Sequence, residues 1–195
     1  MSDKALVKKI LSGDRAAGER LVTAHYPRIF RLLRCLANNA EAAQDLTQQT
    51  FARAWQGLPS YQGRASLATW LHRIAYHEYT HWLRSRRDHL PLEEAFGIED
   101  LREARGLDSI LVSRALARLP DEERETFLLY YMQEFSVEET AAILDVAAGT
   151  VKSRLFTARK RLRELLQAAD APSAPQTASD SEGPLLFSSV EGGRL

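Results

Sequence analysis

The apolar residues of this chain recur every three or four positions along most of its length, and no stretch of four or more residues alternates between apolar and polar. A spacing of three or four residues is typical of an amphipathic α-helix, whereas alternation is typical of a half-buried β-strand. The hydrophobic fraction of 45% and the charged fraction of 27% are those of a soluble globular protein. We therefore predict an all-α fold with two small helical domains joined by a flexible linker.

Turn-forming residues divide the helical pattern into segments. The expected helices cover residues 3–12, 15–37, 40–57, 66–87, 109–118, 121–134, 136–145 and 149–167. Ser136 followed by Glu139 is a capping-box signal for the start of the seventh. The first domain is expected over 1–88, a linker rich in acids and interrupted by Pro and Gly over 89–108, and the second domain over 109–167. Residues 168–195 are rich in Ala, Ser, Pro and Gly, and we expect them to be disordered.

The chain carries the marks of a cytoplasmic protein. Its one cysteine, Cys35, excludes an intramolecular disulfide and favours a reducing compartment. The first residues, MSDKALVKKILSGD, lack the apolar core of a signal peptide. No run approaches the roughly 20 apolar residues that cross a bilayer, so no direct membrane insertion is expected.

The formal net charge of zero hides two basic blocks separated by an acidic one. Residues 20–87 have a net charge of +7, residues 88–125 of −6, and residues 148–167 of +5. Two basic surfaces joined by an acidic connector favour two separate contacts with a polyanion. Three solvated helix surfaces would have the same composition, so charge alone leaves both interpretations open.

Residues 136–162, SVEETAAILDVAAGTVKSRLFTARKRL, follow the pattern of a helix-turn-helix. A short helix is followed by a tight connection at Gly149 and then by a cationic helix with a separate packing face. In DNA-binding proteins of this kind the second helix enters the major groove by its N-terminal residues. Lys152 and Arg154 suit guanine edges or phosphates, and Ser153 and Thr157 suit a base edge or a phosphate oxygen.

The predicted helix at 66–87 combines arginines with aromatic residues, directly after the polar loop PSYQGRAS at 59–66. This combination suits unpaired DNA, because arginines hold phosphates while aromatic rings stack on an extruded base. The aromatic candidates are Tyr61, Trp70 and Tyr76. A core helix with a solvated basic face is the alternative.

The same helix contains His77-Glu78-Tyr79-Thr80-His81, which matches the H-E-x-x-H motif of zinc peptidases. A zinc site needs a third ligand, but the positions that supply Gly and His in the extended motif hold Arg84 and Arg87. Cations beside Zn²⁺ are electrostatically unfavourable. We expect no metal, no cofactor and no catalytic residue here. Glu78 falls on the apolar side of the helix, where a carboxylate needs an arginine partner.

Taken together, residues 5–167 resemble a bacterial RNA polymerase sigma factor of the extracytoplasmic-function type. AQDLTQQTFARAW at 43–55 resembles the region 2 helix that binds core RNA polymerase. Residues 61–87 resemble the segment that melts and reads the minus-ten element. Residues 119–162 resemble region 4, which reads the minus-thirty-five element.

The resemblance implies roles for individual residues. Asp45, Gln48 and Phe51 would contact core polymerase. Promoter DNA would be bound by Tyr61, Arg64, Ser66, Trp70, Arg73, His77, Arg84 and Arg87 in region 2, and by Lys152, Ser153, Arg154, Phe156, Thr157 and Arg159 in region 4. It also implies an alternative sigma factor without catalytic residues, which an anti-sigma factor would hold inactive.

Three residues depart from the family pattern. Gln49 replaces a usual acid, His77 a common asparagine, and Thr157 a frequent arginine. The first puts the contact with core polymerase in question. The second and third put the base preference at the minus-ten and the minus-thirty-five element in question. The alternative functions are a helix-turn-helix regulator that binds duplex DNA without polymerase and a zinc hydrolase that uses His77, Glu78 and His81.

Overall fold

The structure, a computed structural model, describes residues 2–87 and 110–170. The predicted linker at 89–108 and almost all of the predicted tail lie outside these residues. In the described part the secondary structure is helical, as predicted, and no strand is present. The domain boundaries predicted from the sequence stay predictions.

The N-terminal half contains four α-helices. They are α1 (Asp3–Leu11), α2 (Arg15–Ala37), α3 (Ala40–Gly57) and α4 (Leu67–Arg87), with a short 3-10 turn, η1 (Leu58–Ser60), after α3. Local signals set the starts of the first three, because the side chains of Ser2, Asp14 and Asn39 each accept a hydrogen bond from a first-turn N–H of the helix that follows. Asn38 ends α2 in the left-handed conformation, with φ of 50°.

The C-terminal half contains α5 (Ile110–Ala117), α6 (Asp121–Phe127), α7 (Val137–Leu144) and α8 (Ala148–Asp170). The helix predicted over 121–134 is shorter, because a π-helical turn, η3 (Leu128–Met132), follows α6 and ends it. The predicted capping box is present: the Ser136 hydroxyl accepts from the Glu139 N–H, and the Glu139 carboxylate accepts from the Ser136 N–H.

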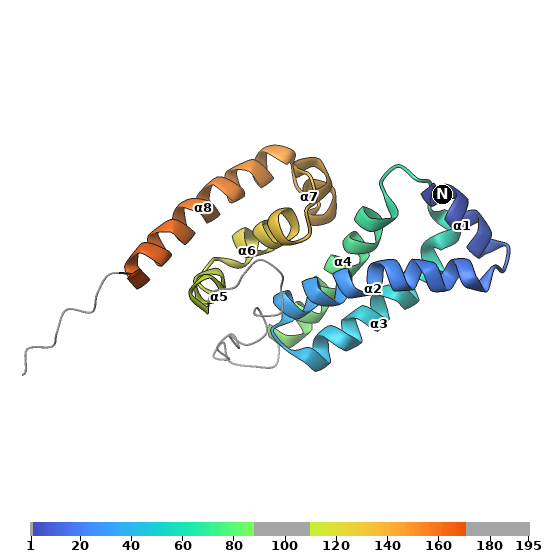
Figure 1. The fold of residues 1–195 in the computed structure, drawn as a ribbon, viewed down its shortest axis with the longest axis horizontal. Helices are drawn as coiled ribbons and strands as arrows, with labels where there is room; N and C mark the ends of the chain where they lie inside the picture. Colours follow the sequence, from blue (N-terminus) through green and yellow to red (C-terminus); the bar gives the residue numbers. More distant parts are fainter. Residues whose placement is uncertain (1, 88–109, 171–195) are drawn as a thin grey trace, which may run out of the picture.

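The largest hydrophobic core extends across both halves. Leu32, Leu71 and Ala75 from the N-terminal half join Leu129 and Ile143 from the C-terminal half in one buried cluster. Helix α4 packs against α2 and α3 on one side and against α7 on the other, so it lies at the boundary of the two halves (Figure 1). Two smaller clusters hold α8 against α5, α6 and α7.

Candidate polymerase and nucleic-acid interface

Helices α7 and α8 form the helix-turn-helix predicted from the sequence. Asp145 ends α7 in the left-handed conformation, with φ of 58°, and the Val146 N–H donates to the Ala141 carbonyl, 3.1 Å away. This turn lets α8 begin at Ala148. One face of α8 is buried by Val151, Leu155, Ala158 and Leu162. The opposite face is therefore fixed toward solvent.

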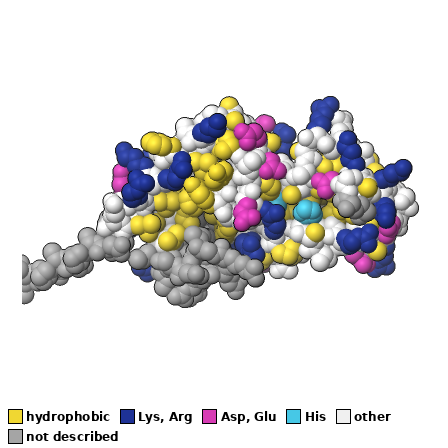
Figure 2. All heavy atoms as spheres, turned by 45° about the horizontal axis from the view of Figure 1, so that its top comes forward, with side chains coloured by type: hydrophobic (Ala, Val, Ile, Leu, Met, Phe, Trp, Pro, Cys, Tyr) yellow, Lys and Arg dark blue, Asp and Glu magenta, His cyan; other side chains and the backbone are white. Residues whose placement is uncertain are grey.

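The exposed face of α8 carries most of the predicted recognition residues. Lys152, Ser153, Phe156 and Arg159 are exposed, and Phe156 is 65% exposed although it is apolar. The hydroxyls of Ser153 and Thr157 donate to carbonyls one turn back. Lys and Arg side chains gather over α8 at the end of the molecule remote from α1 (Figure 2). This face combines cations, hydroxyls and an aromatic ring, the groups that contact phosphates and base edges.

Arg154 differs from these residues. Its side chain is only 18% exposed, and its guanidinium donates to the Glu122 carboxylate on α6 over 2.6 Å. Arg161 also pairs with α6, 3.4 Å from Glu123. The structure thus gives Arg154 a bracing contact between α6 and α8 that was not among its predicted roles.

The loop and helix predicted to receive unpaired DNA place several of their candidate side chains together. The Tyr61 hydroxyl donates to the Ala65 carbonyl, and its ring centroid lies 5.4 Å from that of Trp70. Ser66 bonds with Thr69 at the start of α4. Arg64, His77 and Arg84 are exposed, whereas the side chain of Arg87 lies outside the described part of the chain. An aromatic pair therefore stands beside the exposed loop.

Glu78, the central residue of the H-E-x-x-H match, is paired with an arginine. Its carboxylate lies 2.6 Å from Nε of Arg53 on α3, and the residue is only 9% exposed. His77 and His81 are both exposed. Within 2–87 and 110–170, no group of three or more His, Cys, Asp or Glu side chains is placed to hold a metal ion. The carboxylate that would act as the general base of a peptidase serves here in packing α3 against α4.

The predicted polymerase-binding residues on α3 divide into two groups. Asp45 and Gln48 are exposed, and so is Gln49, where the family pattern has an acid. Phe51 is buried at 7% exposure and stacks with Tyr26, 6.0 Å between ring centroids. In this conformation Phe51 supports the helix from inside, and Asp45 and Gln48 supply the outer surface.

Comparison with known protein families assigns both halves of the chain. Residues 21–89 match the family described as Sigma-70 region 2, and residues 109–162 match Sigma-70, region 4. The chain is 38% identical over 167 residues to the ECF RNA polymerase sigma factor SigM of Mycobacterium tuberculosis strain H37Rv, covering 85% of each protein. The chain belongs to the ECF family of RNA polymerase sigma factors. As a sigma factor it directs promoter-specific transcription.

Other relatives agree with this assignment. ECF sigma factor SigW of Bacillus subtilis is 28% identical over 183 residues, which cover 86% of this sigma factor and 98% of SigW. Among solved structures, RpoE of Bartonella quintana, determined with the anti-sigma factor NepR, is 30% identical with a TM-score of 0.65 and covers 76% and 96% of the two chains. CnrH, determined with the cytosolic domain of CnrY, is 25% identical with a TM-score of 0.68 over 85% and 97%.

In this sigma factor, region 4 packs directly on α4 of region 2. The Tyr76 hydroxyl donates to the Glu125 carboxylate on α6 over 2.7 Å, and Arg73 donates to Asp145 over 3.2 Å. Burial raises the pKa of the Tyr76 hydroxyl, as does the nearby Glu125. Burial also raises the pKa of Glu125, which the hydrogen bond from Tyr76 opposes. Local sequence patterns carried no signal for these contacts, because the partners are far apart in the chain.

A histidine is enclosed at the same boundary. His72 on α4 is fully buried, its Nδ1 lies 2.8 Å from the Ala68 carbonyl, and its ring meets that of Phe135 edge-on at 4.7 Å. Burial lowers the pKa of His72 to about 4, and the positive charge of Arg28 adds to the effect against the opposing hydrogen bond to Ala68. At neutral pH the imidazole is therefore neutral.

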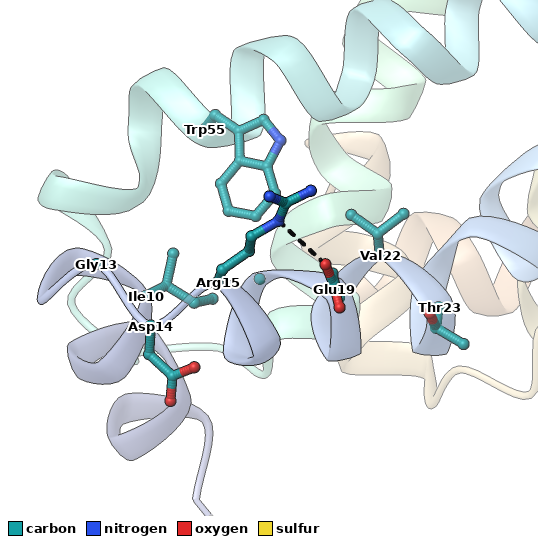
Figure 3. Close-up of a pocket in the computed structure, with 9 residues that line it drawn as sticks. Ile10, Gly13, Asp14, Arg15, Glu19, Val22, Thr23 and Trp55 are labelled. Carbon is teal, nitrogen blue, oxygen red and sulfur yellow. Dashed lines mark hydrogen bonds and ion pairs between the residues drawn. The ribbon is translucent and has the colours of Figure 1, made fainter.

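A surface hollow of about 480 Å³ lies between α1, α2 and the end of α3 (Figure 3). It is lined by the apolar side chains of Ile10, Val22 and Trp55 and by the Arg15–Glu19 pair, whose charged groups are 3.3 Å apart. Trp55 is 39% exposed and continues the face of α3 that carries Asp45 and Gln48.

In the described residues, no helix is both long and apolar enough to cross a membrane.

Proposed function

We propose that this ECF sigma factor initiates transcription by three contacts, each made by a separate surface. The outer face of α3 docks on core RNA polymerase. The exposed face of α8 reads the minus-thirty-five element in the major groove. The loop at 59–66 and the following helix trap an unpaired base of the non-template strand at the minus-ten element. The observation that carries the proposal is the face of α8 with Lys152, Phe156 and Arg159 exposed opposite a fully buried packing face.

The strand contact needs no chemical step. Flipping one base out of a duplex costs a few kcal/mol, which stacking and phosphate contacts offset. The aromatic pair of Tyr61 and Trp70 and the cation of Arg64 supply groups of these kinds. The protein therefore acts as a binding factor and not as an enzyme, and polymerase performs the chemistry. We place its action in the cytoplasm, where polymerase and promoters are found.

The polymerase contact extends beyond the residues carried over from the family. Trp55 lies two helical turns after Gln48 on α3 and lines the hollow between α1 and α2. Exposed aromatic rings are enriched in protein interfaces. We include Trp55 in the surface that meets core polymerase. We also propose an anti-sigma factor as a partner, by analogy with the relatives whose structures were determined with one.

Reconstituted transcription tests the proposal. The protein is added to core RNA polymerase with promoter fragments of its source genome, and promoter-specific transcripts are scored. An Asp45→Ala/Gln48→Ala variant is expected to lose initiation and keep binding of minus-thirty-five duplex. A Lys152→Ala/Arg159→Ala variant is expected to lose duplex binding and keep core binding. Replacing Arg163, an exposed cation further along α8, serves as the control.

The two alternatives predict different results. A helix-turn-helix regulator would bind duplex DNA without stable binding to core polymerase. A zinc hydrolase would hold stoichiometric zinc that a His77→Ala change removes. Folded protein that supports no initiation on any promoter would overturn the sigma-factor mechanism.

A further inference from the structure

Helix α1 contacts the first turn of α4, where the loop at 59–66 ends. The Leu67 N–H, at the first position of α4, donates to the Asp3 carboxylate over 2.7 Å, although the two residues are 64 positions apart in the chain. The first N–H groups of an α-helix have no partner within the helix itself. A carboxylate at this end also lies at the positive end of the helix dipole. Asp3 therefore caps α4 from a different helix.

The start of α4 also has a local cap. The Ser66 hydroxyl accepts from the Thr69 N–H over 3.1 Å. This bond shapes the first turn of α4, but it does not fix that turn relative to the rest of the domain. The bond to Asp3 does so, because α1 packs against both α2 and η1.

The next residue of α1 meets the middle of the same loop. A carbon added at Gly63 would lie 2.9 Å from Cγ of Lys4, and it would be closer still to Cε. Gly63 also has φ of +69°, a conformation that favours glycine. The Lys4 side chain therefore lies directly against the loop backbone, and a larger residue at position 63 would push the two apart.

Helix α1 thus supports the loop at its start, its middle and its end, through η1, Gly63 and Leu67. Figure 1 shows α1 beside the segment that joins α3 to α4. The side chains of the loop that stay exposed are Gln62, Arg64, Ala65 and Ser66. No residue of α1 is among the predicted DNA-binding residues, so its contribution here is to the position of the loop.

Support of this kind acts on binding through the free state of the loop. A loop that becomes ordered only on binding loses conformational freedom at that step, and the loss opposes binding. If only a fraction of the molecules holds the competent conformation, the apparent affinity falls by that fraction. A cap that holds the loop in place beforehand therefore raises the affinity without touching the ligand.

We propose that Asp3 is a positioning residue for the minus-ten strand. From α1 it holds the loop at 59–66 and the first turn of α4 in the conformation that receives an unpaired base, and the stem of Lys4 supports the same loop at Gly63. Helix α1 acts through the loop and makes no contact with the strand. This inference rests on the proposed strand-binding role of the loop.

Two substitutions separate the hydrogen bond from the charge. Asp3→Ala removes the acceptor of the Leu67 N–H, whereas the amide oxygen of Asp3→Asn can still accept. Ser2 caps α1 in both variants. The control variant, Asn39→Ala, removes the cap of α3, where Asn39 accepts from the Ala42 N–H over 2.8 Å, and so measures the effect of losing a cap elsewhere. Circular dichroism and thermal melting establish that each variant folds.

Trypsin cleavage after Arg64 measures the position of the loop in the free protein. Arg64 is exposed, and cleavage requires local opening, so its rate follows the fraction of molecules with a released loop. We expect cleavage at this site to be about fivefold faster or more in Asp3→Ala than in the wild type, by mass spectrometry of early products. Asp3→Asn and Asn39→Ala should stay within about twofold.

The strand contact is measured with holoenzyme formed from core RNA polymerase and each variant. The probes are a single-stranded non-template minus-ten oligonucleotide and the same oligonucleotide with one abasic position, moved through the element. We expect Asp3→Ala to bind the intact probe about tenfold more weakly and to distinguish less between the two probes. Asp3→Asn and Asn39→Ala should match the wild type within about twofold. Core binding and minus-thirty-five duplex binding should not change for any variant.

Three results would overturn the proposal. The first is wild-type strand affinity in Asp3→Ala, whether or not cleavage after Arg64 is faster. The second is an equal loss in Asn39→Ala, because the effect would then be general destabilisation. The third is an equal loss in Asp3→Asn, because the acceptor oxygen would then have no role.

Lys4 distinguishes support of the loop from direct contact with DNA. Lys4→Met keeps an unbranched stem against Gly63 without the charge, whereas Lys4→Ala removes the stem. We expect Lys4→Ala to bind the intact probe about threefold more weakly and Lys4→Met to match the wild type. Equal losses in the two variants would mean that α1 meets the strand through its charge, which contradicts the proposal.

Failure of this inference is separable from failure of the proposed function. If wild-type holoenzyme distinguishes the intact from the abasic probe and Asp3→Ala does so equally well, only the role of Asp3 is wrong. If wild-type holoenzyme binds both probes equally at every abasic position, the loop receives no base. The proposed function of the loop is then wrong, and the role of Asp3 with it.

Discussion

The ion pair between Arg53 and Glu78 predicts an asymmetric response to substitution. Glu78 is nearly buried between α3 and α4, with 11% of its side chain exposed, whereas 64% of the Arg53 side chain is exposed. Replacing Arg53 by Met leaves an enclosed carboxylate without its cation. Replacing Glu78 by Leu leaves a cation that water can solvate. We therefore expect the Arg53 variant to be the less stable of the two.

The magnitude follows from the exposure of each partner. A pair enclosed on both sides loses about 3–5 kcal/mol when one partner is removed, but the guanidinium here is largely in solvent, so screening reduces the effect. Leaving the carboxylate unsatisfied costs about 1–3 kcal/mol, and we expect about 2 kcal/mol for Arg53→Met. Glu78→Leu should cost less than about 1 kcal/mol. The double variant should recover most of the loss, because an apolar pair of similar size replaces the ion pair.

Tryptophan fluorescence gives a direct assay for this pair. The three tryptophans, Trp55, Trp70 and Trp82, all lie in region 2, so urea unfolding followed by their emission reports on the domain that contains the pair. A coupling energy of about 1 kcal/mol or more from the double-mutant cycle is expected. Equal costs for the two single variants, or a cost below about 0.5 kcal/mol for Arg53→Met, would refute the reasoning.

Three further predictions test other parts of the structure. Lowering the pH from 7 to 5 should lower the free energy of unfolding by up to about 2 kcal/mol through His72. The unfolded state binds a proton below its ordinary pKa of 6.5, whereas the folded state resists it down to about 4. The contribution of His72 to stability is complete above pH 6.5 and is lost progressively as the pH falls toward 4. A His72→Phe variant whose free energy of unfolding, measured by urea titration, has the same pH dependence as that of the wild type would contradict this prediction. Gly63→Ala should lower the free energy of unfolding by about 1 kcal/mol, because φ at Gly63 is +69°. Gly149→Ala should raise the free energy of unfolding by about 0.5 kcal/mol, because Gly149 lies in α8 and the added carbon would meet open space. If chemical denaturation gave changes of the same sign for the two glycine substitutions, this reasoning would be wrong. Lys152→Ala should weaken minus-thirty-five duplex binding and reduce the slope of log affinity against log salt by about 1. An unchanged slope in anisotropy titrations would remove Lys152 from the phosphate contacts.

Helix positions were predictable because their signals are local. The caps at Ser2, Asp14, Asn39 and Ser136 each lie within three residues of the N–H that they accept from. The π-helical turn at 128–132 was missed, since Leu, Tyr and Met fit an α-helix equally well. The turn lets the Gln133 N–H donate to the Leu128 carbonyl and ends the helix before the contact with Arg28.

The exposed face of a single helix in the candidate site was predictable from the sequence, whereas the side-chain contacts between helices were not. The exposed side of α8 follows from its apolar spacing, yet Arg154 turned out to face Glu122, 32 positions earlier. Amphipathicity showed that Glu78 needs an arginine, but several arginines were available and only packing of α3 on α4 selected Arg53. The contact of region 4 with α4 depends on residues 49 to 72 positions apart. Hydrophobic periodicity indicates which face of a helix is buried, but not which residues from distant parts of the chain come into contact.

Asp145 ends α7 in the left-handed conformation and also faces Arg73 across the boundary. Asparagine and glycine both accept that backbone conformation, and each is one nucleotide change away from an aspartate codon. A single mutation can therefore keep the turn before the recognition helix intact and weaken only the contact with region 2. Through this position, the strength of the contact between the two regions can change while the DNA-facing side of α8 stays the same.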